Sequence, residues 1–109
     1  MPFDENLASR VRKILARHRG VNERKMFGGL CFTVNGHMLC GVNKENLMIR
    51  IGSESYDEAL SKPHVRKMDF TGRALKGFIY VDPEGYRSDE SLKYWIKAGL
   101  QFVSGLPPK

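Results

Sequence analysis

The sequence predicts an α+β fold, in which an antiparallel sheet of about five strands forms one layer and helices form the other. Amphipathic helical patterns near both ends of the chain enclose a middle part that is rich in strand-like runs. Two of these runs are separated only by Asn35-Gly36, a pair that accepts the positive φ angles of a type I′ hairpin turn. A chain of 109 residues has room for one domain, which is expected to span residues 1–109.

The spacing of apolar residues predicts a helix over residues 4–19. Asp4 is the expected N-cap, and Gly20 suits the position that follows a helix end. The inward stripe recurs every three or four residues and consists of Leu7, Val11, Ile14, Leu15 and His18.

Val21 to Lys25 is interpreted as a connection, after which Met26-Phe27 opens a strand. Gly28-Gly29 is expected to bend or bulge that strand. A phosphate-binding loop is the alternative for a glycine pair, but it requires a following helix, and here a strand follows.

The hairpin pairs residues 30–34 with residues 37–42. A two-residue loop places Val34 opposite His37, Phe32 opposite Leu39, and Cys31 opposite Cys40. Period-two alternation then assigns each side chain to one of two faces of the sheet. The face expected to pack on the helices carries Leu30, Phe32, Val34, His37 and Leu39. The other face carries Cys31, Thr33, Met38, Cys40 and Val42.

Further strands are predicted at residues 47–51, 65–70 and 77–81, with a turn at residues 82–85. Ser55 and Glu58 have the spacing of a capping box, which predicts a short helix over residues 56–61. A final helix is predicted from Ser88 to Ser104. Its apolar stripe consists of Leu92, Trp95, Ile96, Gly99, Phe102 and Val103.

The composition, 41% hydrophobic and 28% charged, is typical of a soluble globular protein. No apolar run approaches the roughly 20 residues that a membrane helix needs. The first residues lack the pattern of a secretory leader. A cytoplasmic protein without a membrane partner is therefore expected.

The formal net charge is +6, and the excess of basic residues is largest in residues 1–25. Polyanions are attracted to such a segment, so the sequence offers a candidate for nucleic-acid contact through phosphates without sequence readout. The candidate residues are Arg10, Lys13, Arg17, Arg24 and Lys25. A solvated helix face in a mildly basic protein remains the alternative interpretation.

No catalytic, metal-binding or cofactor-binding constellation is visible. The two cysteines lack Cys-x-x-Cys spacing, and the three histidines are far apart in the sequence. Alternation also places His37 on the opposite face from Cys31 and Cys40, which argues against a Cys–His pair. A reversible Cys31–Cys40 disulfide stays open as an alternative, although thiols in the cytosol are normally reduced.

The face formed by Cys31, Thr33, Met38, Cys40 and Val42 is less polar than a solvated surface. It is therefore a candidate interaction face that a partner covers. That partner could be another protein or a second copy of this chain, which would also be able to pair through a sheet edge.

One stretch has a specific pattern: Arg24-Lys25-Met26-Phe27-Gly28-Gly29-Leu30-Cys31-Phe32, followed by the tight turn and a second strand. Three later blocks follow in the same order, namely Leu47 to Arg50, Met68-Asp69-Phe70, and Lys76 to Gly85. Leu92, Trp95 and Ala98 then lie on the last helix. Together these blocks resemble the TfoX (Sxy) N-terminal domain family over nearly the whole chain.

The resemblance implies a two-layer α+β fold similar to that of type III secretion chaperones. It also implies a regulatory, non-enzymatic role, since named members of the family regulate natural competence and are thought to act with the cyclic-AMP receptor protein at promoters. The expected function is therefore a regulatory protein-interaction module in transcriptional or competence-type regulation. Weak nucleic-acid binding through the basic first helix is the alternative.

Overall fold

The computed structural model describes residues 4–26, 29–68 and 76–107. Within these residues the chain forms one antiparallel sheet of six strands in the order β1-β2-β3-β4-β6-β5. The strands are β1 (Val21–Met26), β2 (Gly29–Val34), β3 (His37–Asn43), β4 (Asn46–Arg50), β5 (Val65–Lys67) and β6 (Phe78–Val81). The helices are α1 (Glu5–Leu15), α2 (Tyr56–Leu60), α3 (Pro83–Tyr86) and α4 (Asp89–Ser104).

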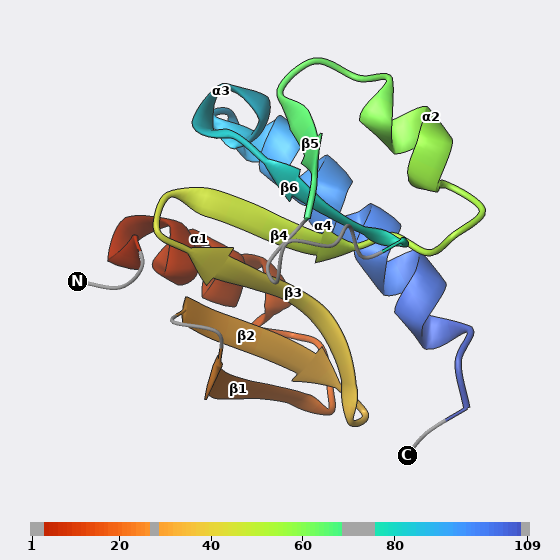
Figure 1. Ribbon diagram of the computed structural model, residues 1–109. Coiled ribbons are helices and arrows are strands. Elements are labelled where there is room, and N and C mark those ends of the chain that lie inside the picture. Colours follow the sequence, from red (N-terminus) through yellow and green to blue (C-terminus); the bar gives the residue numbers. More distant parts are fainter. Residues whose placement is uncertain (1–3, 27–28, 69–75, 108–109) are drawn as a thin grey trace.

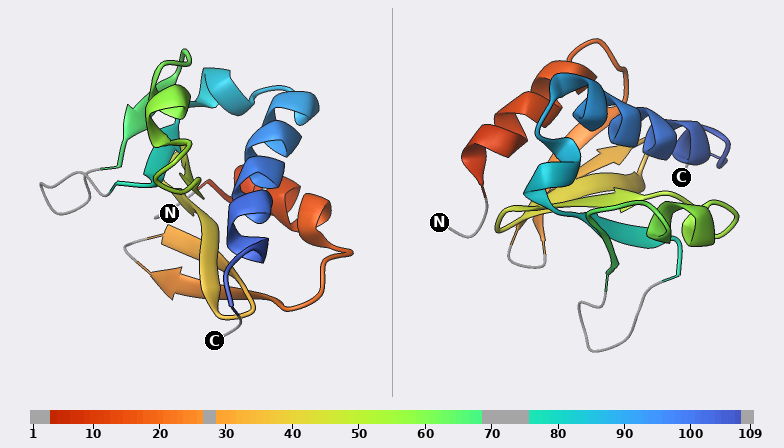
Figure 2. Two further views of the ribbon diagram at one scale, coloured as in Figure 1. Left: turned by 90° about the vertical axis from the view of Figure 1, so that its right-hand side faces the viewer. Right: turned by 90° about the horizontal axis from the view of Figure 1, so that it is seen from above.

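Helices α1 and α4 lie together on one face of the sheet, as the two views of Figure 2 show. The main core fills the space between these layers. Most of its apolar side chains come from α1, α4 and the facing side of the strands, including Leu7, Val11, Phe32, Leu39 and Ile96, and α2 and α3 add Tyr56, Ala59 and Tyr86. Helix α2 lies beside β5 and β6, and α3 leads directly into α4 (Figure 1). The predicted two-layer α+β fold is confirmed.

The first helix begins as predicted and ends earlier. The Asp4 carboxylate accepts hydrogen bonds from the backbone N–H groups of Asn6 and Leu7, at 2.9 and 3.1 Å. The regular helix stops at Leu15 rather than at residue 19, and the His18 N–H bonds to the Leu15 carbonyl in a tight turn. His18 is exposed, so its predicted place in the inward stripe was wrong.

The segment interpreted as a connection, Val21 to Lys25, is strand β1. It lies at one edge of the sheet, and residues 22–25 are all exposed. An edge strand with solvent on both faces does not need the apolar alternation by which strands are recognised, and charged residues protect such an edge from unwanted pairing. For this reason its sequence resembled a polar loop.

The hairpin turn has the predicted form, because Asn35 and Gly36 have φ angles of 52° and 86°. Val34 pairs with His37 and Thr33 with Met38, as expected. The register then shifts by one residue, so that Phe32 pairs with Cys40 rather than with Leu39. A β-bulge of this kind adds one residue to one strand and changes the side on which the following residues lie.

The bulge corrects the predicted pairing of the cysteines. Cys31 lies opposite Gly41, and Cys40 lies opposite Phe32. Cys40 and Val42 join the main core on the helix side, whereas Cys31 belongs to a separate cluster on the other face. The two thiols are free and buried. The alternative of a reversible disulfide across the hairpin therefore loses its geometric basis.

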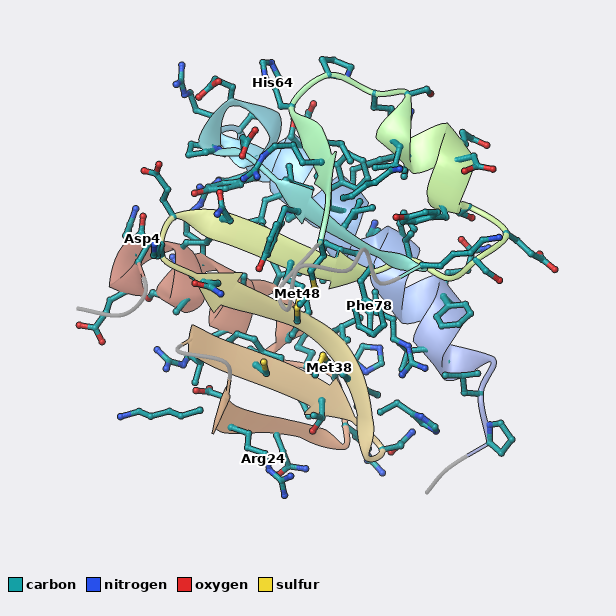
Figure 3. The ribbon with its side chains drawn as sticks, viewed as in Figure 1. Asp4, Arg24, Met38, Met48, His64 and Phe78 are labelled. Carbon is teal, nitrogen blue, oxygen red and sulfur yellow. The ribbon has the colours of Figure 1, made fainter. Side chains whose placement is uncertain are left out.

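The helix-free face of the sheet carries a second, smaller apolar cluster. Its buried members are Cys31, Met48, Met68 and Tyr80, with Met38 and Phe78 partly buried beside them. Figure 3 shows Met38, Met48 and Phe78 on this face. Burial in an apolar environment raises the pKa of both thiols, because it disfavours the thiolate.

Gly29 is required by close packing between β2 and β3. A Cβ atom at this position would lie 2.2 Å from the Val42 carbonyl oxygen. The interpretation of this glycine as a matter of backbone geometry is therefore supported by its surroundings. Gly28 and Phe27 lie outside the described residues, as do residues 69–75, which contain the end of the strand predicted at 65–70 and most of the following loop.

The second half of the chain follows the predicted order of elements. Ser88 caps α4, since its hydroxyl oxygen accepts a hydrogen bond from the Ser91 N–H at 3.1 Å. Ser55 makes no such bond to α2, so the predicted capping box does not form. The turn predicted at residues 82–85 is a single helical turn, α3, which has Pro83 at its start.

Candidate functional site

A hollow with a volume of about 750 Å³ lies between α2 and α4. Helix α4 forms one wall and α2 with the segment before it forms the other (Figure 1). The apolar part of the lining comes from Ile51, Ala59, Trp95, Ala98, Phe102 and Leu106. The polar part comes from Ser53, Glu54, Ser55, Glu58, Lys62, Lys97 and Gln101. This hollow therefore has an apolar wall and a charged rim.

Tyr94 lies at one end of this hollow. Its side chain is 49% exposed, and it is the large hydrophobic side chain that the described part of the chain leaves exposed. Its ring packs edge-to-face against Trp95, with the ring centroids 5.0 Å apart. The Lys62 ammonium lies 5.4 Å from the centroid of the Tyr94 ring, within the range of a cation–π contact. Trp95 is held in place because its Nε1–H donates to the Gly85 carbonyl at 3.2 Å.

A second hollow of about 420 Å³ continues on the other side of the Lys62–Tyr94 contact. Lys62, Tyr94 and Trp95 line both hollows. The second is otherwise lined by Pro63, His64, Glu84, Gly85, Glu90 and Ser91. The two hollows thus lie next to each other along α4, with the Lys62–Tyr94 contact between them, and together they are called the α2–α4 groove.

His64 has a backbone conformation that is uncommon for residues other than glycine, with φ at 66°. The Asp82 N–H donates to the His64 carbonyl at 2.8 Å and holds the segment against α3. The His64 Nδ1 atom lies 3.6 Å from the Glu84 carboxylate, and both side chains are about half exposed. Figure 3 shows His64 at the turn that joins α2 to β5.

The structure separates the residues proposed from the sequence as a polyanion site. Arg10 is already engaged: its Nη2 donates to the carbonyls of Tyr86 and Arg87, each at 3.0 Å, and lies 3.3 Å from the Asp89 carboxylate. Arg10 thus fastens α1 to the segment between α3 and α4.

Arg24 and Lys25 lie on opposite faces of β1, because Arg24 pairs with Cys31 and Lys25 with Leu30. Lys25 shares the helix face with Glu23, which bonds to Arg12 of α1 at 2.7 Å. Lys13 and Arg17 are exposed on or just beyond α1. Of the two β1 residues, Lys25 lies on the same face of the sheet as α1, whereas Arg24 lies on the other.

The residues of the predicted interaction face are also divided. The bulge places Cys40 and Val42 in the main core, and Cys31 is buried in the second cluster. Thr33 and Met38 remain half-buried on the helix-free face.

Within residues 4–26, 29–68 and 76–107, no three His, Cys, Asp or Glu side chains come close enough together to hold a metal ion. No helix in this part of the chain has both the length and the hydropathy needed to cross a membrane.

Comparison with protein families gives a match to the TfoX N-terminal domain over residues 13–103 of the 109-residue chain. The chain belongs to this family. The resemblance that the Met-Phe-Gly-Gly stretch and the later blocks predicted is thereby confirmed. The TfoX N-terminal domain is a regulatory domain family without known catalysis, and it is associated with competence regulation. No curated protein sequence is significantly similar to the chain.

Sequence reasoning did not find the groove of this TfoX N-terminal domain. Its walls come from segments more than 30 residues apart, around residues 51–62 and 94–106. One signal was available, because Tyr94 is an aromatic residue on the otherwise polar side of the last helix. An aromatic side chain on a solvated face is more informative than an aliphatic one, since tyrosine is enriched at protein interfaces.

Proposed function

We propose that this TfoX N-terminal domain is a non-enzymatic regulatory module of the cytoplasm, which acts in transcriptional or competence-type regulation by binding another protein. The α2–α4 groove is its contact surface. The observation that carries the proposal is the exposed Tyr94 ring, which lies between two connected hollows and is backed by the buried Trp95.

The groove suits a protein segment better than a small molecule. It is open to solvent, and it consists of two hollows that meet at the Lys62–Tyr94 contact. Small-molecule sites enclose most of the ligand surface, whereas protein contacts place one or two aromatic anchors among polar residues at a rim. Tyr94 with Trp95 has the second arrangement.

The test compares two neighbouring substitutions on α4. Tyr94→Ala removes the exposed ring, and Lys93→Ala removes an exposed side chain that lines neither hollow. Tagged wild type and both variants are purified from the native cell, and the associated proteins and nucleic acids are quantified. We expect Tyr94→Ala to lose at least one protein that wild type and Lys93→Ala retain, and that protein to bind the purified wild-type domain directly.

If both variants retain the same proteins in the same amounts, the groove is not the contact surface and the proposal fails. The folding of Tyr94→Ala is checked by its circular dichroism and thermal transition, which are expected to match wild type because the ring is half exposed.

A second candidate function is polyanion binding by Lys13, Arg17 and Lys25, which are exposed and form no ion pair within the described residues. Phosphate contacts of this kind weaken steeply as salt is added. Binding of labelled duplex and single-stranded DNA is measured at low and high salt for wild type and for a Lys13→Ala, Arg17→Ala, Lys25→Ala variant. Salt-sensitive binding that the triple variant loses supports this candidate, and no binding at low salt excludes it.

A further inference from the structure

The groove has the opposite charge from the molecule as a whole. Its lining contains four glutamates, which are Glu54, Glu58, Glu84 and Glu90, against the two lysines Lys62 and Lys97. With His64 neutral, the lining therefore carries a net charge of −2, whereas the whole chain carries +6.

The glutamates of the groove are available to a ligand. All four are exposed. Within the described residues, Glu54, Glu58 and Glu90 form no ion pair, and Glu84 faces only the half-exposed His64. Glu54 and Glu58 lie on the α2 side of the larger hollow, and Glu84 and Glu90 lie around the smaller one.

The lysines of the groove balance the glutamates in the larger hollow, which holds two of each, but Lys62 alone faces two glutamates in the smaller one. Lys62 is held at the division between the two hollows, with its ammonium over the Tyr94 ring. Lys97 lies on α4 in the larger hollow only. Each hollow thus combines carboxylates at the rim with the apolar ring of Trp95 at its base, and Phe102 and Leu106 add apolar surface in the larger one.

On this basis, and resting on the proposed function, we infer that the α2–α4 groove binds a basic segment of its partner protein, in which apolar residues alternate with lysine or arginine. The apolar side chains pack against Trp95, Phe102 and Leu106. The basic side chains reach the carboxylates of Glu54 and Glu58 in one hollow and of Glu84 and Glu90 in the other. Complementary charge selects this class of segment and repels acidic ones.

Trp95 provides a direct reporter, because it lines both hollows and is the one tryptophan of the chain. The probe is a short synthetic peptide in which leucine alternates with lysine, and the control peptide has glutamate in place of every lysine. Titration of each into the full chain is followed by Trp95 emission and by calorimetry. We expect saturable binding of the lysine peptide, which weakens as salt is raised, and no saturable binding of the glutamate peptide.

Two variants of α2 and its N-terminal flank locate the contact. We expect Glu54→Gln with Glu58→Gln to weaken binding of the lysine peptide about fivefold, as two partly exposed ion pairs would. Asp57→Asn removes one carboxylate charge from an exposed position of α2 that lines neither hollow, and it is expected to change the affinity less than about twofold, which is compared with half of the double variant's effect in free energy.

Equal affinity for the two peptides, or an equal effect of the two sets of variants, overturns the inference. Tighter binding of the glutamate peptide also overturns it, while leaving the groove as a contact surface. If neither peptide changes the Trp95 emission but Tyr94→Ala still loses its cellular partner, the charge assignment alone has failed. Sedimentation that shows a dimer in wild type and a monomer in Tyr94→Ala assigns the groove to a second copy of the chain and likewise overturns it.

Discussion

A single methyl group at Gly52 is expected to disrupt the packing of the groove wall. It links β4 to the wall of the larger hollow and has φ at 89°, which is the left-handed region that disfavours a side chain. A Cβ atom there would lie 2.5 Å from Cδ1 and 2.7 Å from Cε1 of the Phe102 ring. The Gly52→Ala variant must therefore adopt a strained backbone and also displace Phe102.

The two costs can be added. An alanine in the left-handed region costs about 1–2 kcal/mol, and overpacking of a filled site costs about 1–3 kcal/mol. The reduced entropy of the unfolded chain returns about 0.4–1 kcal/mol. We therefore expect Gly52→Ala to lower the free energy of unfolding by about 2–3 kcal/mol, and the melting temperature by about 10 °C or more.

Gly105→Ala is the matched control. Gly105 also lines the groove, but its φ is −82°, and the nearest atom to an added Cβ is 3.5 Å away. The free energy of unfolding of the Gly105→Ala variant is expected to stay within about 0.5 kcal/mol of wild type. Urea unfolding followed by Trp95 fluorescence measures all of these differences.

A double-mutant cycle separates the two costs. In a Phe102→Ala background the collision is removed, so Gly52→Ala should cost only the backbone strain, about 1–2 kcal/mol. If Gly52→Ala is as stable as wild type, or if its cost is the same with and without the Phe102 ring, the described packing of the groove wall is wrong.

Three other predictions concern the rest of the fold. Cys31 and Cys40 are expected to react slowly with thiol reagents in the native protein and quickly after unfolding, because burial raises the pKa of both thiols. A disulfide formed in the folded chain under mild oxidation would contradict the bulged register. The Arg12 guanidinium lowers the pKa of Glu23, mainly through the hydrogen bond between them. The Glu23 carboxylate therefore stabilises the fold at pH values above the ordinary glutamate pKa, and this stabilisation is lost as the pH falls through the lowered pKa of the folded state. Glu23→Gln should be less stable than wild type by no more than about 1 kcal/mol at neutral pH, with the difference closing in acid unfolding curves. Tyr86→Phe removes the hydroxyl that donates to the Glu45 carbonyl at 2.6 Å. This substitution should lower the free energy of unfolding, measured by urea unfolding, by about 1–2 kcal/mol. Burial raises the pKa of the Tyr86 hydroxyl to about 12, so above pH 10 this tyrosine ionises more readily in the unfolded chain than in the folded one, and the wild type loses stability. Tyr86→Phe has no such hydroxyl, so its stability should fall less as the pH rises above 10.

Local signals in the sequence predicted the elements whose form depends on neighbouring residues. The Asn35-Gly36 turn and the Asp4 cap each depend on groups within three residues of one another, and each is present. Features set by distant residues were not predictable in this way. Strand β1 was missed because an edge strand with two solvated faces has no apolar alternation.

The bulge in the hairpin had a larger consequence than the missed strand. One extra residue on β3, Leu39 between Met38 and Cys40, reversed the face of Cys40 and Val42, which are two of the five residues of the predicted interaction face. Period-two counting has no means of detecting such an insertion. The groove was beyond local reasoning for a different reason, since Tyr94 and Lys62 meet only after α2 and α4 have packed on the same sheet.

The function proposed for this TfoX N-terminal domain requires a protein bound at the α2–α4 groove. The most direct measurement places a photo-crosslinking benzoylphenylalanine at position 94 in the native cell, and at position 93 as the matched control. We expect one defined protein adduct from position 94, absent from position 93 and reduced by Glu54→Gln with Glu58→Gln. Identical adducts from both positions, or nucleic acid as the crosslinked species at position 94, would contradict it.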